Sequence, residues 1–302
     1  MQCVRSIAAT FLLLAVSAIQ PAFAIVFQTA ADQTAGLGAG QAFLNPEAKL
    51  VIGLSNGSQA GCSGSLLAGG QYVLTAAHCV TGDSGTLSAT SINVDFTNVG
   101  LDVVTTSYFV DPTWNGSLTN GGDLALIKLA APVTTISGYT LDTASSAVGQ
   151  LVTLTGYGNT GVGGGGYTAG TFGTLYYGTN TYIGVYSNLP SAYAYQYTQT
   201  FGTGVAPDVM VAPGDSGGAS LLDINGTWEI VGVHDFIACQ TNGCTPNSSY
   251  GQLGGDTSVY ADQSWIGSVV PEPAPTPVLL ISIGLLGLTR LRRRLPPQHR
   301  DR

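Results

Sequence analysis

The segment Pro213-Gly214-Asp215-Ser216-Gly217-Gly218 places one serine hydroxyl among glycines, which allow the backbone to turn sharply around it. Two earlier segments carry the other notable groups, Leu74-Thr75-Ala76-Ala77-His78-Cys79 and Gly122-Asp123-Leu124-Ala125-Leu126-Ile127-Lys128-Leu129. Taken singly, each has an ordinary structural interpretation: a tight turn, a histidine that follows a strand, and an aspartate that opens a strand. The coincidence of all three, in the order His, Asp, Ser, predicts instead a site built on a nucleophilic serine.

The residue types assign a role to each member of this group. The hydroxyl of Ser216 is a weak nucleophile at neutral pH because it holds its proton. A neutral imidazole can take that proton and later return it to a leaving amine, which is the role predicted for His78. Only two histidines lie between residues 25 and 270, so His78 has little competition for it. Asp123 is predicted to orient the imidazole and to stabilise the imidazolium as it forms.

In these segments the chain resembles the chymotrypsin/trypsin family of serine endopeptidases, whose triad occurs in the same chain order. The resemblance covers nearly all of residues 49–268. It includes a turn, a last strand and a terminal helix, at Gly156-Tyr157-Gly158-Asn159-Thr160 (Tyr where the family has Trp), Val259-Tyr260 and Trp265-Ile266. It implies an all-β fold of two antiparallel six-stranded β-barrels with a short C-terminal helix, and an active site in the cleft between the barrels.

The resemblance also implies further features of the site. The backbone amides of Gly214 and Ser216 would form an oxyanion hole, and Cys62 and Cys79 would form the disulfide beside the catalytic histidine. The implied reaction is peptide-bond hydrolysis through an acyl-enzyme intermediate, on a protein or peptide substrate and with no cofactor. No Asp-x-Asp-x-Asp-Gly run occurs, and no metal site is predicted.

Substrate preference is predicted from two positions. Met210 stands six residues before Ser216, where the family lines the base of its primary pocket, and the lack of an acidic residue there disfavours cleavage after Lys or Arg. His234 follows Gly232-Val233 and resembles the histidine of bacterial glutamyl endopeptidases, whose imidazole receives a substrate carboxylate. A structural histidine beside Asp235 is the favoured alternative.

The N-terminal residues 1–24 are typical of a secretory signal peptide. They contain Arg5, an apolar run over residues 8–19 and the small-x-small ending Ala22-Phe23-Ala24. A buried N-terminal helix is the alternative. Cleavage after Ala24 would remove Cys3 and leave four cysteines, an even number that favours disulfides in an exported chain.

One disulfide predicted among these four cysteines differs from the pattern of the family. Ala212 stands where the family has a cysteine beside the nucleophile, so the disulfide at that place is not expected. Cys239 and Cys244, five positions apart, instead suggest a disulfide within one loop.

Signal-peptide cleavage would also expose Ile25-Val26. In the family, a newly formed N-terminal Ile buries its amine against the Asp that precedes the nucleophile, here Asp215, and this salt bridge activates the zymogen. Export itself is therefore a hypothetical activation step. The family continues with Gly-Gly, whereas Phe27-Gln28 follow here. There are three alternatives. The position of Ile25-Val26 after a common cleavage signature can be a coincidence, a second cut can fall between residues 29 and 48, or the protein has no zymogen step.

The C-terminal residues 271–302 resemble the PEP-CTERM sorting tail of bacterial surface proteins. Pro271-Glu272-Pro273 is followed by an apolar run over residues 278–288 and by a cluster of arginines that begins at Arg290. The resemblance implies export from a Gram-negative-type bacterium, transient tethering in the inner membrane by the apolar helix, and processing by sorting machinery of the exosortase type. Release to the cell surface or extracellular matrix would follow. A simple C-terminal membrane anchor is the alternative.

Composition excludes several other classes of protein. Only 9% of the 302 residues are charged and 44% are hydrophobic, which opposes intrinsic disorder, and no helical heptads indicate a coiled coil. Between residues 25 and 270, Lys49 and Lys128 are the only cations beside fifteen carboxylates, a formal charge of −13. Such a surface repels phosphate backbones and excludes nucleic acid as a partner.

Short β-rich runs separated by Gly, Asn and Ser clusters independently favour an all-β fold. The expected strands are 49–54, 72–76, 102–110, 124–129 and 151–156, and the one expected helix is 261–269. The glycine-rich residues 156–184 are expected to form a long surface loop, or alternatively a low-complexity linker. The domain division is then a signal peptide (1–24), an N-terminal segment with a hypothesised role in activation (25–48), a peptidase domain (49–270) and a sorting tail (271–302).

The sequence thus predicts an exported serine endopeptidase. A catalytically silent surface or matrix-binding protein of the same fold is the main alternative, and the complete triad argues against it. A structural matrix protein would fit the content of glycine and tyrosine, and an esterase would fit the triad. The first leaves the catalytic motifs unexplained, and the second is disfavoured by the Gly-Asp-Ser-Gly-Gly context.

Overall fold

The computed structural model describes residues 25–118, 120–185, 196–200, 208–240 and 243–271. The predicted signal peptide, residues 1–24, lies outside this part of the chain, and so does the predicted tail from residue 272 onward. Within the described residues, no helix combines the length and apolar character needed to cross a membrane.

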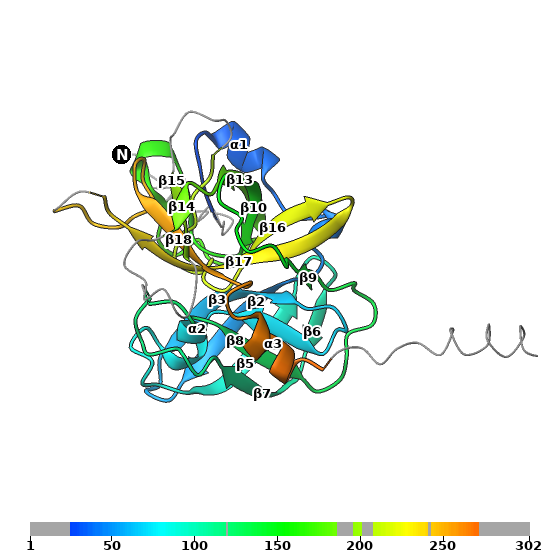
Figure 1. Cartoon of the computed structure of the whole chain (residues 1–302). Helices are drawn as coiled ribbons and strands as arrows, with labels where there is room; N and C mark the ends of the chain where they lie inside the picture. The colour runs from blue at the N-terminus through cyan, green and yellow to red at the C-terminus, as the bar shows by residue number, and fades with distance from the viewer. Residues whose placement is uncertain (1–24, 119, 186–195, 201–207, 241–242, 272–302) are drawn as a thin grey trace, which may run out of the picture.

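The first barrel is formed by residues 47–129. Its strands are β2 (Glu47–Leu54), β3 (Gln59–Leu66), β4 (Tyr72–Thr75), β5 (Ala89–Phe96), β6 (Leu101–Val103), β7 (Thr105–Val110) and β8 (Ala125–Leu129). They are ordered β6-β5-β2-β3-β4-β8-β7, with antiparallel pairing throughout. Only Val104 separates β6 from β7, so one bent stretch pairs with β5 at one end and with β8 at the other. Seven labelled strands therefore close as a six-stranded barrel, the lower one in Figure 1.

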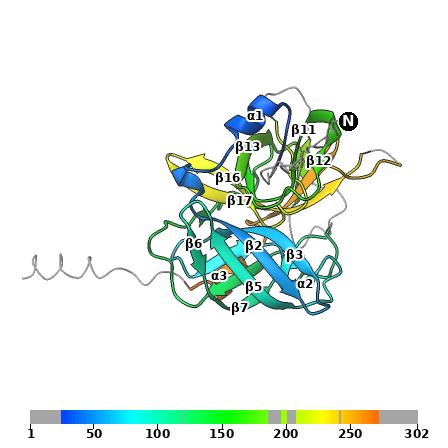
Figure 2. The same cartoon turned by 180° about the vertical axis from the view of Figure 1, so that it is seen from behind.

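The second barrel repeats this arrangement. Its strands are β10 (Leu151–Gly156), β13 (Tyr176–Thr181), β14 (Gly184–Val185), β15 (Gln196–Thr200), β16 (Ala219–Ile224), β17 (Thr227–Ala238) and β18 (Leu253–Ser258). The order is β13-β10-β16-β17-β18-β15-β14, and Tyr182 and Ile183 alone separate the two end strands. The short β9 (Thr140–Leu141) adds a parallel pairing to β17. The expected fold of two six-stranded antiparallel barrels is confirmed (Figures 1 and 2).

The helices are short, and two of them were not expected from the sequence. They are α1 (Ala30–Ala35), α2 (Ala77–Thr81) and α3 (Gln263–Val269), with 3-10 turns η1 (Ala42–Leu44) and η2 (Gly163–Gly165). The C-terminal helix α3 agrees with the predicted helix 261–269. It buries Ile266 in the apolar cluster that fills the first barrel, although it follows the last strand of the second.

Residues 25–48, whose structure the sequence did not predict, begin in the second barrel. Strand β1 (Ile25–Phe27) pairs in parallel with β11 (Thr160–Val162), which pairs in turn with β12 (Tyr167–Thr168). Val26 also exchanges two backbone hydrogen bonds with Met210, of 2.8 and 3.0 Å. All three side chains of β1 are buried in the core cluster of the second barrel. The segment is therefore part of the fold rather than an appendage to it.

The expectation of a long loop over residues 156–184 is wrong, because this stretch contains β11, η2, β12 and β13. Tyr176 and Tyr182 lie in the core of the second barrel. The glycines allow backbones to approach closely rather than allowing the chain to move. A Cβ on Gly161 would stand 1.9 Å from the carbonyl oxygen of Gly166, and one on Gly178 would stand 2.4 Å from a methyl of Val209.

Tyr157 joins the two barrels. It follows β10 of the second barrel, but its fully buried side chain belongs to the apolar cluster of the first. Its hydroxyl donates to the carbonyl oxygen of Glu47 at 3.1 Å, and its backbone N–H donates to Ser63 Oγ at 2.9 Å. The two barrels are thereby fixed to each other beside the predicted active site.

Candidate active site

The predicted general base, His78, lies on the single turn of α2, directly after β4. This helix is covalently tied to β3 by the disulfide between Cys62 and Cys79, which confirms the pairing expected from the family resemblance. Thr81 Oγ1 donates to the carbonyl oxygen of Ala77 at 2.9 Å and closes the turn. The imidazole is therefore carried by a rigid, mostly buried segment, with 8% of His78 exposed.

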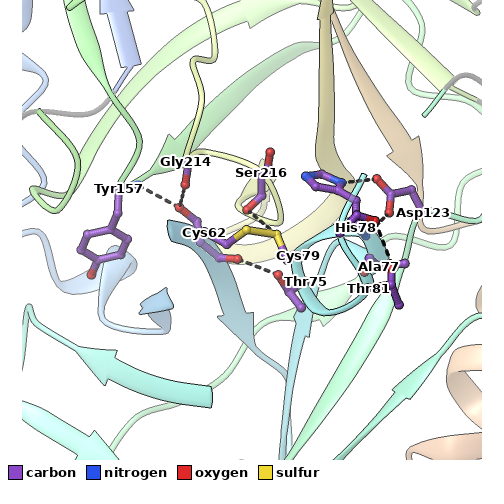
Figure 3. Close-up of a disulfide and its surroundings, with 12 residues drawn as sticks. Cys62, Thr75, Ala77, His78, Cys79, Thr81, Asp123, Tyr157, Gly214 and Ser216 are labelled. Atoms are coloured by element: carbon purple, nitrogen blue, oxygen red, sulfur yellow. Dashed lines mark hydrogen bonds and ion pairs between the residues drawn. A yellow bond between two sulfur atoms is a disulfide. The ribbon is translucent and has the colours of Figure 1, made fainter. Parts of the chain in front are cut away.

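Asp123 holds the imidazole in place. Its Oδ2 accepts the hydrogen bond of His78 Nδ1 at 2.5 Å, and its Oδ1 accepts the His78 backbone N–H at 2.7 Å. The preceding Gly122 has φ of 68°, and a Cβ there would meet Thr113 Oγ1 at 2.1 Å, so glycine is required for this approach. Figure 3 shows the His78 ring lying between Asp123 and Ser216.

This hydrogen bond sets the charges of both partners. Burial disfavours the imidazolium, but the negative charge and hydrogen bond of Asp123 outweigh burial and raise the pKa of His78 above its ordinary value. Burial likewise disfavours the Asp123 carboxylate, but the bonds and charge of His78 lower the pKa of Asp123. Asp123 is thus an anion that stabilises the protonated imidazole, as general-base catalysis requires.

The loop of Ser216 is held by β3 through Ser63. The Ser63 hydroxyl donates to the carbonyl oxygen of Gly214 at 2.9 Å, and the Ser63 N–H donates to the carbonyl oxygen of Ser216 at 2.9 Å. Gly217 has φ of 83°, and a Cβ there would stand 2.1 Å from Thr75 Oγ1. Gly217, next to Ser216, therefore lets the Ser216 loop lie directly on the first barrel.

The backbone amides of Gly214 and Ser216, which are predicted to bind an oxyanion, differ from their neighbours in hydrogen bonding. The backbone N–H groups of Asp215, Gly217 and Gly218 all donate to carbonyl oxygens, at 2.8 to 2.9 Å. Within the described residues, no backbone acceptor receives the amides of Gly214 or Ser216. Gly214 has φ of 99°. These two amides are therefore available to a carbonyl oxygen that develops negative charge.

A cleft of about 550 Å³ contains these groups and draws its walls from both barrels. Its lining includes His78, Gly214, Ser216 and His234. Met210, predicted at the base of the primary pocket, is not part of this lining. Its side chain is fully buried in the second barrel's core, where its backbone pairs with Val26.

His234 lies at the cleft but is held by a different acid from the one the sequence suggested. Its Nδ1 bonds to Asp256 Oδ1 at 2.9 Å, and Asp256 also accepts the hydroxyls of Tyr182 and Ser220, each at 2.5 Å. Burial disfavours the imidazolium, but the charge and hydrogen bond of Asp256 raise the pKa of His234. The Nε2 atom is buried and has no hydrogen-bond partner among the described residues.

Asp215, the predicted partner of an N-terminal amine, lies beside Ile25. Its fully buried carboxylate accepts backbone N–H groups from Gly158 and Ala212, each at 2.8 Å, and from Ile25. Burial raises the pKa of Asp215 to about 6, against the opposing effects of His234 and these three N–H donors. A Cβ on Gly156 would stand 2.1 Å from Asp215 Oδ1, so the Gly-Tyr-Gly turn makes room for this carboxylate.

Among the residues that the structure describes, two clusters have residue types that can bind metals. In the first, the sulfurs of Cys62 and Cys79 are bonded to each other, so neither offers a thiolate beside His78. In the second, one atom each of His78, Asp123 and Asp235 lies within 4.8 Å of the others, but these atoms are engaged in hydrogen bonds within the cluster. The second predicted disulfide, between Cys239 and Cys244, is confirmed.

Comparisons with known proteins agree with this architecture. A sequence model of the trypsin family matches residues 40–266. Among solved structures, HL collagenase superposes with a TM-score of 0.59 at 22% sequence identity, over 79% of this chain and 98% of the collagenase chain. At that identity the likeness establishes the fold.

Sequence reasoning missed three residues of the site. Ser63 follows Cys62 directly in the sequence, but nothing in the neighbouring residues indicates its hydrogen bond to the loop of Ser216. Asp256 lies 22 residues after the histidine it holds, and only strand pairing between β17 and β18 brings them together. Asp235 was considered only as a neighbour of His234, although it bonds to Asp123.

We predict that Ser63→Ala lowers kcat roughly tenfold with little change in KM, because the loop of Gly214 and Ser216 loses a fixing hydrogen bond. The buried N–H of Tyr157 would lose its acceptor in the same variant. Peptide hydrolysis and the rate of fluorophosphonate labelling measure the effect. Ser65→Ala is the matched control, since this buried serine on the same strand bonds to Glu47 instead. Equal losses in both variants would contradict the assignment.

Proposed function

The chain belongs to the trypsin family, and we propose that it is an exported serine endopeptidase using His78, Asp123 and Ser216. The observation that carries this proposal is the Asp123-bound imidazole of His78, which lies with Ser216 in one cleft. A catalytically silent binding protein would have no use for an oriented imidazole or for two unengaged amides. The geometry therefore favours catalysis over the silent alternative.

The proposed reaction follows from the positions of these groups. Neutral His78 takes the proton of Ser216 Oγ as the oxygen attacks the substrate carbonyl carbon. The carbonyl oxygen becomes an oxyanion that accepts the amides of Gly214 and Ser216. The imidazolium, stabilised by Asp123, then protonates the leaving amine, and a water molecule hydrolyses the acyl-enzyme by the same steps. Because only neutral His78 is a base, the rate rises as pH increases through the raised pKa of His78.

We predict that a fluorophosphonate probe labels the active enzyme at Ser216 alone, and that Ser216→Ala abolishes both labelling and peptide hydrolysis without loss of folding. Mass spectrometry of the modified peptide locates the label, and circular dichroism checks the fold. Peptide hydrolysis that survives in Ser216→Ala at the wild-type rate would remove Ser216 from the mechanism.

We also propose that removal of residues 1–24 activates the enzyme. Asp215 is a buried carboxylate already in contact with the backbone nitrogen of Ile25. Cleavage after Ala24 would convert that N–H donor to an ammonium, which supplies the opposite charge within hydrogen-bond distance. Ile25 also has φ of 62°, a costly conformation for a β-branched residue, and cleavage removes that constraint. A second cut between residues 29 and 48 would instead remove three buried side chains from the core.

We predict that a chain that starts at Ile25 is active, and that a chain that retains Ala24 has at least about a hundredfold lower kcat/KM, because its amine cannot reach the Asp215 carboxylate. The two chains differ by one residue and form a matched pair for rates of hydrolysis and labelling. N-terminal sequencing of enzyme recovered after export identifies the natural start. Equal activity of the two chains would exclude this activation.

We further propose that the enzyme prefers an acidic residue before the scissile bond. Against the opposing effect of burial, the charge and hydrogen bond of Asp256 raise the pKa of His234. The raised pKa favours the imidazolium form, in which Nε2 is a donor, and this buried atom has no partner among the described residues. A buried donor without an acceptor is unfavourable, and a substrate carboxylate would supply the acceptor. Asp256 fixes the ring through Nδ1, so Nε2 can face the cleft that His234 lines.

We predict that peptides with Glu before the scissile bond are cleaved at least about tenfold faster, by kcat/KM, than otherwise identical peptides with Gln. The preference should weaken as pH rises through the raised pKa of His234 and should disappear in His234→Gln. Paired Glu and Gln peptides control for size and shape. A preference for Gln in the wild-type enzyme would overturn the role of His234.

The location of the enzyme is proposed from its terminal sequences. A signal peptide over residues 1–24 would direct export, and the Pro-Glu-Pro tail would hold the enzyme at the inner membrane until an exosortase-type enzyme releases it. The observed disulfides support an oxidising compartment. A simple membrane anchor gives the same exported topology.

A further inference from the structure

Asp235 occupies a special position on β17, directly beside the predicted triad. In the pairing of β17 with β18, His234 is opposite Asp256 and Phe236 is opposite Gly255, so Asp235 is the extra residue of a β-bulge. Bulges beside active sites commonly redirect a side chain out of the regular alternation of a strand. Here the redirected side chain is 5% exposed and lies at the cleft.

The bulge brings the carboxyl group of Asp235 to the carboxyl group of Asp123. The two side chains are hydrogen-bonded, and one carboxyl oxygen of each lies within 4.8 Å of a ring nitrogen of His78. Thr257 Oγ1 donates to Asp235 Oδ2 at 3.3 Å. Two carboxylates contain no donor, so a hydrogen bond between them requires a proton on one of them.

The surrounding contacts decide which carboxyl carries that proton. Asp123 already accepts two N–H groups of His78, which favours its ionised form. On Asp235, the hydroxyl of Thr257 donates to Oδ2 at 3.3 Å, a longer contact than the 2.7 and 2.5 Å hydrogen bonds that Asp123 accepts. The proton therefore resides on Asp235, which donates it to Asp123.

We propose that Asp235 is a positioning residue of the triad: as a neutral carboxylic acid it holds Asp123 against His78, and its ionisation at alkaline pH disables the triad. This inference rests on the proposed endopeptidase function and adds a regulatory group to it. Ionised Asp235 would repel Asp123, and a second negative charge beside His78 would favour imidazolium, which cannot accept the serine proton.

The charged groups around Asp235 act in the same direction. Asp123 lies before β8, and Asp256 lies on β18, while His78 on α2 is already bonded to Asp123. Burial, followed by the charge and hydrogen bond of Asp123 and the charge of Asp256, raises the pKa of Asp235 well above its ordinary value. Each of these effects favours the neutral acid over the carboxylate.

The test compares the pH dependence of kcat/KM in the exported wild-type enzyme and Asp235→Asn. The amide keeps the volume and the donor but cannot ionise, so we expect activity within about threefold of wild type near pH 7. The ratio of wild-type to Asp235→Asn activity should then fall as pH rises through the raised pKa of Asp235. This ratio cancels every ionisation that the two proteins share, including that of the Ile25 amine. A ratio that stays flat over the whole range would overturn the proposal.

Two further variants separate positioning from a merely structural role. Asp235→Ala removes the donor and should lose about tenfold or more in kcat at every pH. Asp262→Asn is the matched control: Asp262 is a buried carboxyl with a pKa raised to about 8, chiefly by burial, but it lies before α3. Its substitution should leave the pH profile of kcat/KM unchanged. An equal change in the Asp262→Asn profile would assign the effect to stability.

A direct readout keeps this test independent of the proposed function. In enzyme labelled with carbon-13 at aspartate carboxyls, the Asp235 signal, assigned by its loss in Asp235→Asn, should show a protonated carboxyl at pH near 7. An ionised Asp235 at that pH would overturn the proposal even if hydrolysis is normal. Failure of the wild-type enzyme to label with fluorophosphonate would contradict the endopeptidase function instead, while this measurement would still decide the state of Asp235.

Discussion

The buried carboxylate of Asp215 is the interaction on which the rest of the site depends. Its oxygens accept backbone N–H groups from three separate segments, those of Ile25, Gly158 and Ala212. One charge therefore fixes the start of the domain, the turn after β10 and the loop that presents Ser216. The glycines at 156 and 158 are required because any side chain there would occupy the space of Asp215. The orientation of the Ser216 loop is thus a consequence of where a charge is buried.

Buried acids are a general feature of this molecule, and a bonded imidazole lowers the pKa of two of them. Asp123 and Asp256 each bond to an imidazole and have a lowered pKa. Glu47 and Asp262 have no imidazole bonded to them, and burial raises their pKa values to about 7 and about 8. A carboxyl whose pKa is raised by folding stabilises the native state at low pH, and this contribution is lost as pH rises through the folded-state value. For Glu47 and Asp262 the loss extends from about pH 4 to about pH 8.

The sequence predicted best what a short segment can encode. The strand at 151–156 and the terminal helix follow from local patterns. The motifs specify His78 and Ser216, which the structure brings to one cleft, and Asp123, which bonds to His78. The two barrels were accessible only through family resemblance, because closure depends on pairings between distant strands. The prediction of a loop over residues 156–184 was wrong because a high glycine content is typical of loops. In this segment the glycines instead permit close packing of backbones. The bonds of Asp235 and His234 depend on strand register and on one bulge, which no local pattern reveals.

That bulge connects the proposed specificity residue to the proposed triad. His234 and Asp235 are consecutive on β17, but the bulge directs the first to Asp256 and the second to Asp123. The backbone at His234 also accepts the N–H of Gly217 and donates to the carbonyl oxygen of Gly218, each at 2.9 Å. One strand segment therefore carries His234, which is the proposed specificity residue, and Asp235, which contacts Asp123. The same segment bonds to the glycines that follow Ser216. In the proposed enzyme, a substrate side chain bound by His234 would act on the same backbone that holds the glycines after Ser216, so substrate binding and the chemical step could not be adjusted independently.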